Sequence, residues 1–156
     1  MDWLEFTAIV VSVVALLVSL LQFFVERQRV RRGETIHELA RLQKEVFNQR
    51  DYLSANVEEI LAEYQSASPG QFPPAWDAIS GYMARIEQFA VGVNTKVYDL
   101  KTLDRMSGIH FIRQYQRLYP IIRHKRVESG SNKRYEEFEL LVRELAALNP
   151  GITVPE

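Results

Sequence analysis

The hydrophobic pattern of this chain changes sharply after its first fifth. Residues 6–25 carry no charged side chain, and a run of arginines follows them. Twenty residues in an α-helix rise about 30 Å, which matches the hydrocarbon thickness of a bilayer. The pattern therefore predicts a transmembrane helix, and we expect residues 1–32 to form an anchor with a basic flank.

Beyond the anchor, apolar residues recur at the three- and four-residue spacing of helices. The sequence predicts an all-α fold, in which residues 33–149 form a small cytosolic bundle of four or five helices and residues 150–156 form a tail. The expected apolar faces are Ile36, Leu39, Leu42, Val46 and Phe47; Leu53, Val57, Ile60, Leu61 and Tyr64; Trp76, Ile79, Met83, Ile86, Phe89, Ala90 and Val93; Leu103 and Met106; Ile109, Ile112, Tyr115, Tyr119 and Ile122; and Phe138, Leu141, Leu145 and Leu148.

Gly33 leaves the start of the bundle open to two interpretations. A continuous helix from the membrane to about Asn48 would cost only about 1 kcal/mol for its internal glycine. Alternatively, Gly33 ends the anchor, and Thr35 with Glu38 forms a capping box for a new helix. We favour the continuous helix, with Asn48 as the cap of the next one.

Polar residues, glycines and prolines mark the later boundaries. Residues 66–74 form the clearest loop, and Pro74 suits the first turn of a helix that ends near Asn94. Asp99 is expected to cap a short helix that breaks or bends at residues 107–108. The other signals are a kink at Pro120, a turn over residues 128–132 and a helix end at residues 149–151.

The charges beside the apolar segment predict its orientation. Arg27, Arg29, Arg31 and Arg32 all follow the segment, and no basic residue precedes it. Because flanking positive charge marks the cytoplasmic side, we expect a single pass through a membrane with the N-terminus outside and the C-terminal domain in the cytosol. The same arginines would lie among anionic headgroups. A cleaved signal peptide is the alternative, but it requires a basic start and a shorter apolar core.

A stripe of small and polar residues runs along the predicted membrane helix. Ala8, Ser12, Ala15, Ser19 and Gln22 are spaced by four and three residues in alternation, and they share one face. Small residues let two helices approach closely, and an amide can bond across the pair. We therefore expect this stripe to pack against a second copy of the chain in a homo-oligomer.

Composition removes several function classes. Nineteen basic and twenty acidic residues nearly cancel, so the chain has no general affinity for nucleic acid. It has no cysteine, which excludes disulfides and thiolate metal sites. The three histidines, His37, His110 and His124, show no metal-binding spacing, and no phosphate-binding glycine loop or nucleophile motif occurs. We expect no cofactor.

Two groups of charged residues remain as candidates for chemistry. Glu87 lies at the border of an apolar face, where it could be a general acid with a raised pKa. We favour a structural ion pair with Arg113 or Arg117 from the next helix. Residues 123–126, Arg-His-Lys-Arg, form the densest positive run in the bundle, and we interpret them as a solvated helix end that complements the helix dipole. Contact with anionic lipids or with a partner is the alternative.

Three short motifs support a family resemblance. They are Ile86-Glu87-Gln88-Phe89-Ala90, leading through Asn94 to Val97-Tyr98-Asp99; Tyr115 with Tyr119-Pro120-Ile121-Ile122; and Tyr135-Glu136-Glu137-Phe138-Glu139. Together with the anchor, they resemble a family of uncharacterised bacterial membrane-anchored helical proteins, one of the domain-of-unknown-function groups. The resemblance implies a helical bundle behind a membrane helix and no assigned activity. It also implies a glycine where Lys96 stands and a tryptophan where Tyr115 stands.

Three hypotheses about function follow. The first is a membrane-anchored, non-enzymatic interaction or regulatory module that self-associates and binds the lipid bilayer and an unknown protein partner. The second is a membrane-acting effector, such as a toxin or a phage-defence component. The third is a membrane-tethered hydrolase with an unrecognised site, for which the sequence offers no nucleophile–base pair.

Overall fold

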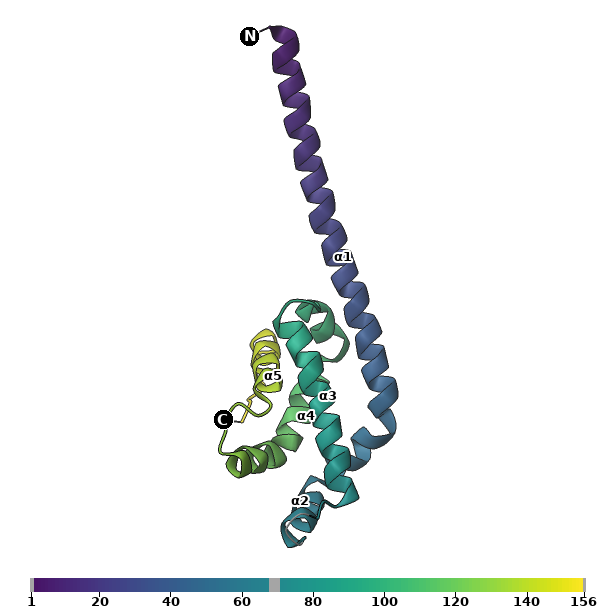
Figure 1. Cartoon of the computed structure of the whole chain (residues 1–156), viewed down its shortest axis with the longest axis vertical. Coiled ribbons are helices and arrows are strands. Elements are labelled where there is room, and N and C mark those ends of the chain that lie inside the picture. Colours follow the sequence, from purple (N-terminus) through teal and green to yellow (C-terminus); the bar gives the residue numbers. More distant parts are fainter. Residues whose placement is uncertain (1, 68–70, 156) are drawn as a thin grey trace.

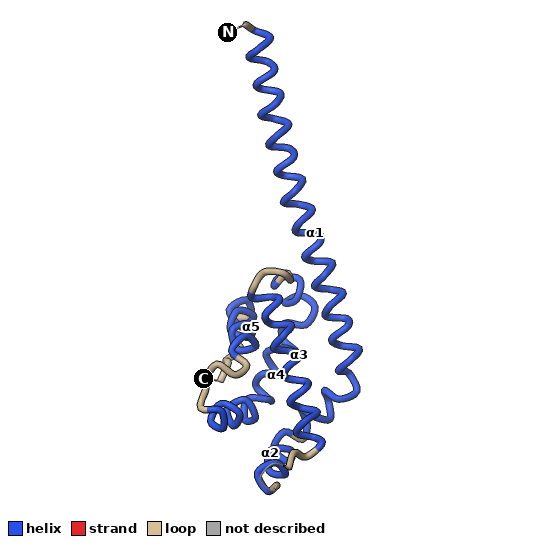
Figure 2. The backbone as a smooth tube through the Cα atoms, viewed as in Figure 1, coloured by secondary structure: helices blue, strands red, loops and turns tan. Residues whose placement is uncertain are grey.

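The computed structural model describes residues 2–67 and 71–155, and within them the chain forms five helices and no strand (Figures 1 and 2). The side chains of residues 5, 6 and 45–55 lie outside this description. Figure 1 shows one long helix that projects from a bundle of shorter helices, with the N-terminus at its far end. The all-α prediction is confirmed.

The long helix α1 (Trp3–Ala55) is continuous, as we predicted, and it passes through Gly33 without a break. The expected cap at Asn48 is wrong, because the helix continues past it and ends only before Asn56. Neither glycine nor proline occurs between Gly33 and this end, so nothing in the backbone forces an earlier stop. The side chains of Val46, Phe47 and Leu53, which we assigned to apolar faces, lie outside the described residues.

The two halves of α1 have different surroundings. The most apolar window of the N-terminal half has a mean hydropathy of 2.7, and none of it is buried against the rest of the chain. It is one helix that is long and apolar enough to span a membrane. The C-terminal half packs on the bundle instead, since Thr35 and Leu39 are buried and Leu42 is half-buried. Ile36, which we expected on this face, is 47% exposed.

The other helices are α2 (Val57–Ser66), α3 (Pro74–Asn94), α4 (Leu100–Ser129) and α5 (Glu136–Leu148). Pro74 stands in the first turn of α3, and the Asp99 carboxylate accepts the Thr102 backbone N–H at 2.8 Å, so both predicted helix starts are confirmed. Gly130, in the left-handed conformation, ends α4 inside the turn we predicted.

The predicted break at residues 107–108 is wrong, because α4 continues through both of them. Gly108 is buried, and a Cβ atom on it would collide with the Asp104 carboxylate and contact Leu145 of α5. This glycine therefore leaves room for the Asp104 carboxylate, which accepts the Asn149 side-chain amide at 2.6 Å at the end of α5, and it does not end a helix. Because the helix is continuous, the face that meets the core differs from the one we expected. Met106 and Ile109 are 46% and 42% exposed, whereas Ser107 and Phe111 are buried.

One core joins α3, α4 and α5 and is covered by α2 and the second half of α1. All seven apolar residues predicted on α3 are buried, with Tyr82 in addition. In α5, Phe138, Leu141 and Leu145 are buried as predicted, whereas Leu148 is 45% exposed. Residues 152–154 belong to this packing too, because Ile152 and Val154 lie against the core and Gln116 donates to the Thr153 carbonyl at 2.6 Å. Part of the predicted tail therefore covers the bundle.

The turn between α3 and α4 contains a strained residue. Lys96 has a φ of 62°, in the left-handed region that favours glycine, and the resemblance implied a glycine at this place. The amides of Val97 and Tyr98 both donate to the Gly92 carbonyl at 2.9 Å, which closes the end of α3. The Tyr98 ring covers Gly92 so closely that a Cβ atom there would collide with it.

We expect Lys96→Gly to raise the free energy of unfolding by about 0.5–1 kcal/mol. The left-handed conformation costs a non-glycine residue about 1–2 kcal/mol, and the extra freedom of glycine in the unfolded chain returns part of this. Thermal unfolding of the full chain in detergent, followed by circular dichroism, measures the change. Lys96→Ala is the control, because it removes the side chain and keeps the strain; an equal gain in both variants would contradict the explanation.

Candidate functional site

The predicted packing stripe lies along the apolar half of α1, where every one of its residues is exposed. The Ser12 hydroxyl donates to the Ala8 carbonyl at 2.8 Å, and the Ser19 hydroxyl donates to the Ala15 carbonyl at 2.9 Å. Both hydroxyls are thus satisfied within their own helix. The stripe could therefore contact a neighbouring helix through its small side chains and through the amide of Gln22, the only amide in residues 6–25.

The basic flank of the anchor is the point where the bundle attaches. Arg27, Arg29 and Arg32 are exposed, whereas the Arg31 guanidinium donates to the Tyr98 carbonyl at 3.0 Å. One helical turn further on, the Thr35 hydroxyl accepts the Asp99 backbone N–H at 2.7 Å. These two contacts bind the turn after α3 to α1 immediately beyond the apolar segment.

The electrostatics of this junction agree with its geometry. Burial alone would raise the pKa of Asp99, but hydrogen bonds from Thr102 and the nearby Arg32 and Arg31 hold it below its ordinary value. Asp99 therefore stays charged while it caps α4 and faces the arginines. Thr35, which we considered as the cap of a new helix, lies inside α1 instead, and from there its hydroxyl binds the Asp99 backbone N–H.

Glu87 joins α3 to the start of α5. Its carboxylate accepts the backbone N–H of Phe138 at 2.8 Å and that of Glu137 at 3.1 Å. These amides belong to the first turn of α5, where no side chain of Tyr135, the residue before the helix, supplies a cap. The expected ion pair with Arg113 or Arg117 is replaced by this cap, since both arginines are exposed and no contact joins them to Glu87 in the described chain.

Partial burial disfavours the charged form of the Glu87 side chain, and the pKa of this group reflects it. Burial raises the pKa of Glu87 above its ordinary value, and the two donated backbone N–H groups offset only part of that rise. Such a shift also fits a general acid, but the side chains that accompany Glu87 do not complete a catalytic pair. Asn94 lies beside it and donates to Glu137, to the carbonyl at 2.9 Å and to the side chain at 2.7 Å. The cluster thus holds α5 in place.

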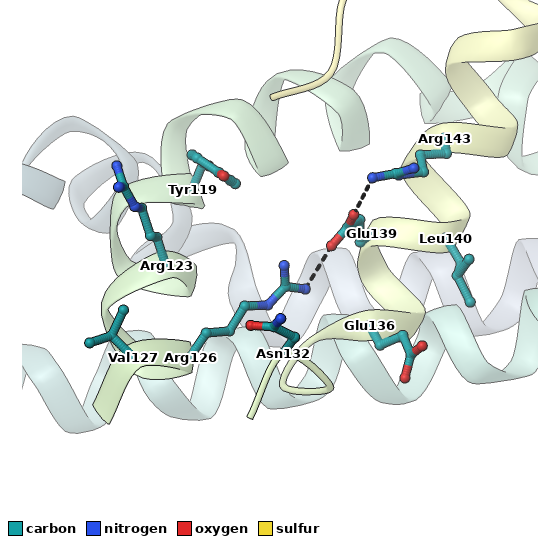
Figure 3. Close-up of a pocket in the computed structure, with 9 residues that line it drawn as sticks. All are labelled: Tyr119, Arg123, Arg126, Val127, Asn132, Glu136, Glu139, Leu140 and Arg143. Atoms are coloured by element: carbon teal, nitrogen blue, oxygen red, sulfur yellow. Dashed lines mark hydrogen bonds and ion pairs between the residues drawn. The ribbon is translucent and has the colours of Figure 1, made fainter. Parts of the chain in front are cut away.

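A pocket of about 570 Å³ lies between the end of α4 and the start of α5 (Figure 3). A Glu139 oxygen lies 2.7 Å from the Arg126 guanidinium, and its other oxygen lies 2.6 Å from that of Arg143. Guanidinium groups can bind carboxylate or phosphate, but Glu139 already occupies two of the three arginines there. The lining residues are Tyr119, Arg123, Arg126, Val127, Asn132, Glu136, Glu139, Leu140 and Arg143.

The basic run at residues 123–126 does not form one patch. Arg123 is exposed in the pocket, and Arg126 is paired with Glu139. The Lys125 side chain is buried instead, with its ammonium 4.3 Å from the centre of the Trp76 ring and donating to the Ser80 hydroxyl at 2.7 Å. A solvated helix end is therefore wrong for Lys125 and Arg126, because successive residues of a helix point in different directions. The expected complement to the helix dipole holds for Arg126, which lies in the last turn of α4.

The comparison with protein families follows the whole fold. A family model described as Domain of unknown function (DUF4760) matches residues 9–145. The chain belongs to this family. The match begins inside the apolar half of α1 and ends in α5, so the family pattern includes both the long helix and the bundle. No curated protein and no solved structure matches the chain.

Tyr115, which we predicted on an apolar face, is fully buried against Phe138, and burial raises the pKa of its hydroxyl to about 12. The contacts of Arg31 and Thr35 with the turn at residues 98–99 were missed, since nothing in a single sequence pairs positions so far apart. Among the described residues, no group of three or more histidines and acids could hold a metal ion.

Removing the Glu87 cap should weaken the bundle. We expect Glu87→Ala to lower the free energy of unfolding by about 2–3 kcal/mol, because two amide groups of α5 lose their acceptor in a half-buried place. Glu87→Gln keeps one acceptor oxygen and should cost about half as much. Denaturant unfolding of the full chain in detergent gives both values; equal losses would show that the cap does not act through hydrogen bonds.

The pH dependence of the same variants provides the control. Since the folded-state pKa of Glu87 is raised, its contribution to stability is greatest below its ordinary pKa of 4.5 and falls as the pH rises through the folded-state value. The stability of Glu87→Gln relative to the parent should therefore improve as the pH rises from 4 to 7. A difference that does not change with pH would contradict the assigned shift.

Proposed function

We propose that this protein is a membrane-anchored, non-enzymatic interaction module that holds its bundle against the bilayer surface. The observation that carries the proposal is the two-part character of α1, whose apolar half is exposed along its length while the half beyond Arg31 is docked on the bundle. A fully exposed apolar helix is unfavourable in water and favourable in lipid. A lipid bilayer therefore supplies the surroundings that the bundle does not provide.

The orientation belongs to the same proposal. The arginines after the apolar segment support a cytosolic bundle at the inner membrane of a bacterium, with the N-terminus outside. Arg27, Arg29 and Arg32 are exposed where headgroups would lie. Their contact with anionic lipid supports both the orientation and the anchoring.

Reporter fusions at the C-terminus test the orientation. We expect a reporter active only in the cytosol to give signal, and one active only in the periplasm to give none, because the basic flank stays on the cytoplasmic side. Replacing Arg27, Arg29 and Arg32 with glutamine, while Arg31 is kept for its contact with Tyr98, should weaken this preference. A periplasmic signal from the unchanged chain would overturn the proposed topology.

Self-association through α1 is the remaining part of the proposal. Its support is the stripe of Ala8, Ser12, Ala15, Ser19 and Gln22, which leaves a narrow face free of bulky side chains. Because the serine hydroxyls bond within their own helix, close packing and the Gln22 amide must supply the attraction. The partner that this face fits is a second copy of the same helix.

The chain has no cysteine, so single cysteines can locate the interface in intact membranes. We expect Ala15→Cys to crosslink on oxidation and Leu17→Cys, on the opposite face, to crosslink far less. Adding Ser12→Ile and Ser19→Ile to the Ala15→Cys variant should lower the dimer-to-monomer ratio about tenfold, since bulky side chains on this face keep the two helix backbones apart.

The matched control adds Val13→Ile and Leu17→Ile, which place the same side chain on the other face of α1. These changes should leave crosslinking through Ala15→Cys unchanged. Equal crosslinking in both combinations, or none in the parent variant, would show that the stripe is not an interface.

A further inference from the structure

We propose that the turn between α3 and α4, residues 95–101, is a second membrane contact, at which Lys96 and Lys101 bind anionic phosphate headgroups and Val97 enters the interface. The inference rests on the proposed membrane anchoring and extends it to a part of the chain far from the anchor in sequence. The turn would contact the same leaflet that α1 enters. Three observations support this contact: the position of the turn along α1, the charge of its lysines and the exposure of its side chains.

The height of the turn is fixed by α1. From Val25, the last residue of the apolar segment, to Arg31 the helix rises about 9 Å. The headgroup layer on each side of a bilayer is about 5–8 Å thick, so Arg31 stands at its outer edge. Arg31 binds the Tyr98 carbonyl, and Thr35, one helical turn further on, accepts the Asp99 backbone N–H, so the turn lies between these two levels, about 9–15 Å beyond Val25. Figure 1 shows this end of the bundle as the one nearest the projecting half of α1. An ordinary tilt of about 20° towards the bundle would lower the turn towards the headgroups.

The side chains of the turn suit that place. Lys96 and Lys101 are exposed, and Val97 is an apolar residue with 56% of its surface exposed. Lysine ammonium groups bind phosphates, and an apolar side chain at an interface can enter the region between headgroups and acyl chains. Asp99, the acidic residue of the turn, is committed to capping α4 and to Arg31 and Arg32.

Both lysines are unfavourable within the isolated fold. Lys96 occupies a left-handed conformation that glycine would adopt without strain. Lys101 stands in the first turn of α4, where the helix dipole disfavours a positive charge. The first turns of α2, α3 and α5 all carry acidic residues, as the dipole favours. Departures from local rules occur where a chain serves an external contact, and an anionic surface is the contact that would compensate these two.

The test places a fluorescent label on a single cysteine in the full chain reconstituted in vesicles and measures quenching by acrylamide in the water. Val97→Cys reports the turn. Val127→Cys is the matched control, since Val127 is also an exposed valine but lies in the last turn of α4, at the end of the bundle away from the anchor (Figure 1). Leu17→Cys reports insertion of α1 independently of the turn.

We expect the label at Val97 to be shielded in phosphatidylglycerol–phosphatidylcholine vesicles and the label at Val127 to stay accessible. Lys96→Gln and Lys101→Gln should each lower the ratio of docked to undocked turn about fivefold. Pure phosphatidylcholine vesicles, which lack anionic headgroups, should also lower this ratio without any mutation. High salt should reverse the shielding.

Three results would overturn the proposal. If Val97 and Val127 are equally accessible while Leu17 is shielded, the anchor stands and the second contact fails. If Leu17 is accessible, the anchoring itself fails. If the label at Val97 is shielded equally in neutral vesicles and the shielding increases with the protein-to-lipid ratio, a second copy of the chain covers the turn instead of lipid.

Discussion

The hydrogen bonds of Arg31 and Thr35 to the turn after α3 determine where the bundle lies relative to the apolar half of α1. They act just beyond the last apolar residues, and the helix that carries them is unbroken from Trp3 to Ala55. A continuous helix transmits position and direction much better than a linker does. For that reason the apolar half of α1 and the bundle form one body, and in the proposed membrane arrangement the height of each surface above the bilayer would follow from the sequence of a single helix.

Inside the bundle, the charged side chains with defined partners mainly hold helices together. Glu87 of α3 caps α5, Glu139 of α5 binds Arg126 of α4, and Lys125 lies over the Trp76 ring of α3. Each group is at least half-buried or shares its charge with a neighbour, so removing one partner would leave an unpaired charge or a bare helix end. The surfaces on which our proposals rest lie outside these contacts, on α1 and in the turn between α3 and α4.

The sequence predicted the features that depend on neighbouring residues. The apolar segment, the face of α3, Pro74 and the Asp99 cap follow from composition and short spacing, and all appear as expected. It failed where tertiary contacts decide. Gly108 was interpreted as a break because glycine is a poor helix former, yet it lies inside a continuous helix and leaves room for the Asp104 carboxylate, which binds Asn149 at the end of α5. Glu87 was correctly placed at a helix border, but its partner is a pair of backbone amides, which no side-chain pattern reveals.

Lys96 and Glu87 both have an energetic cost in the folded state, but the fold offsets only the cost of Glu87. Glu87 is costly to bury, but it satisfies two amides of α5 that would otherwise lack partners, so its cost is offset within the fold. The Lys96 backbone N–H donates to the Val93 carbonyl at 2.9 Å, but in the part of the chain that the structure describes its side chain makes no hydrogen bond or ion pair that would offset the left-handed conformation. The family model matches residues 9–145, a range that covers both this turn and most of the apolar half of α1. A strained, exposed basic residue beside that helix suits the proposed lipid-facing surface, because an anionic surface would offset its cost.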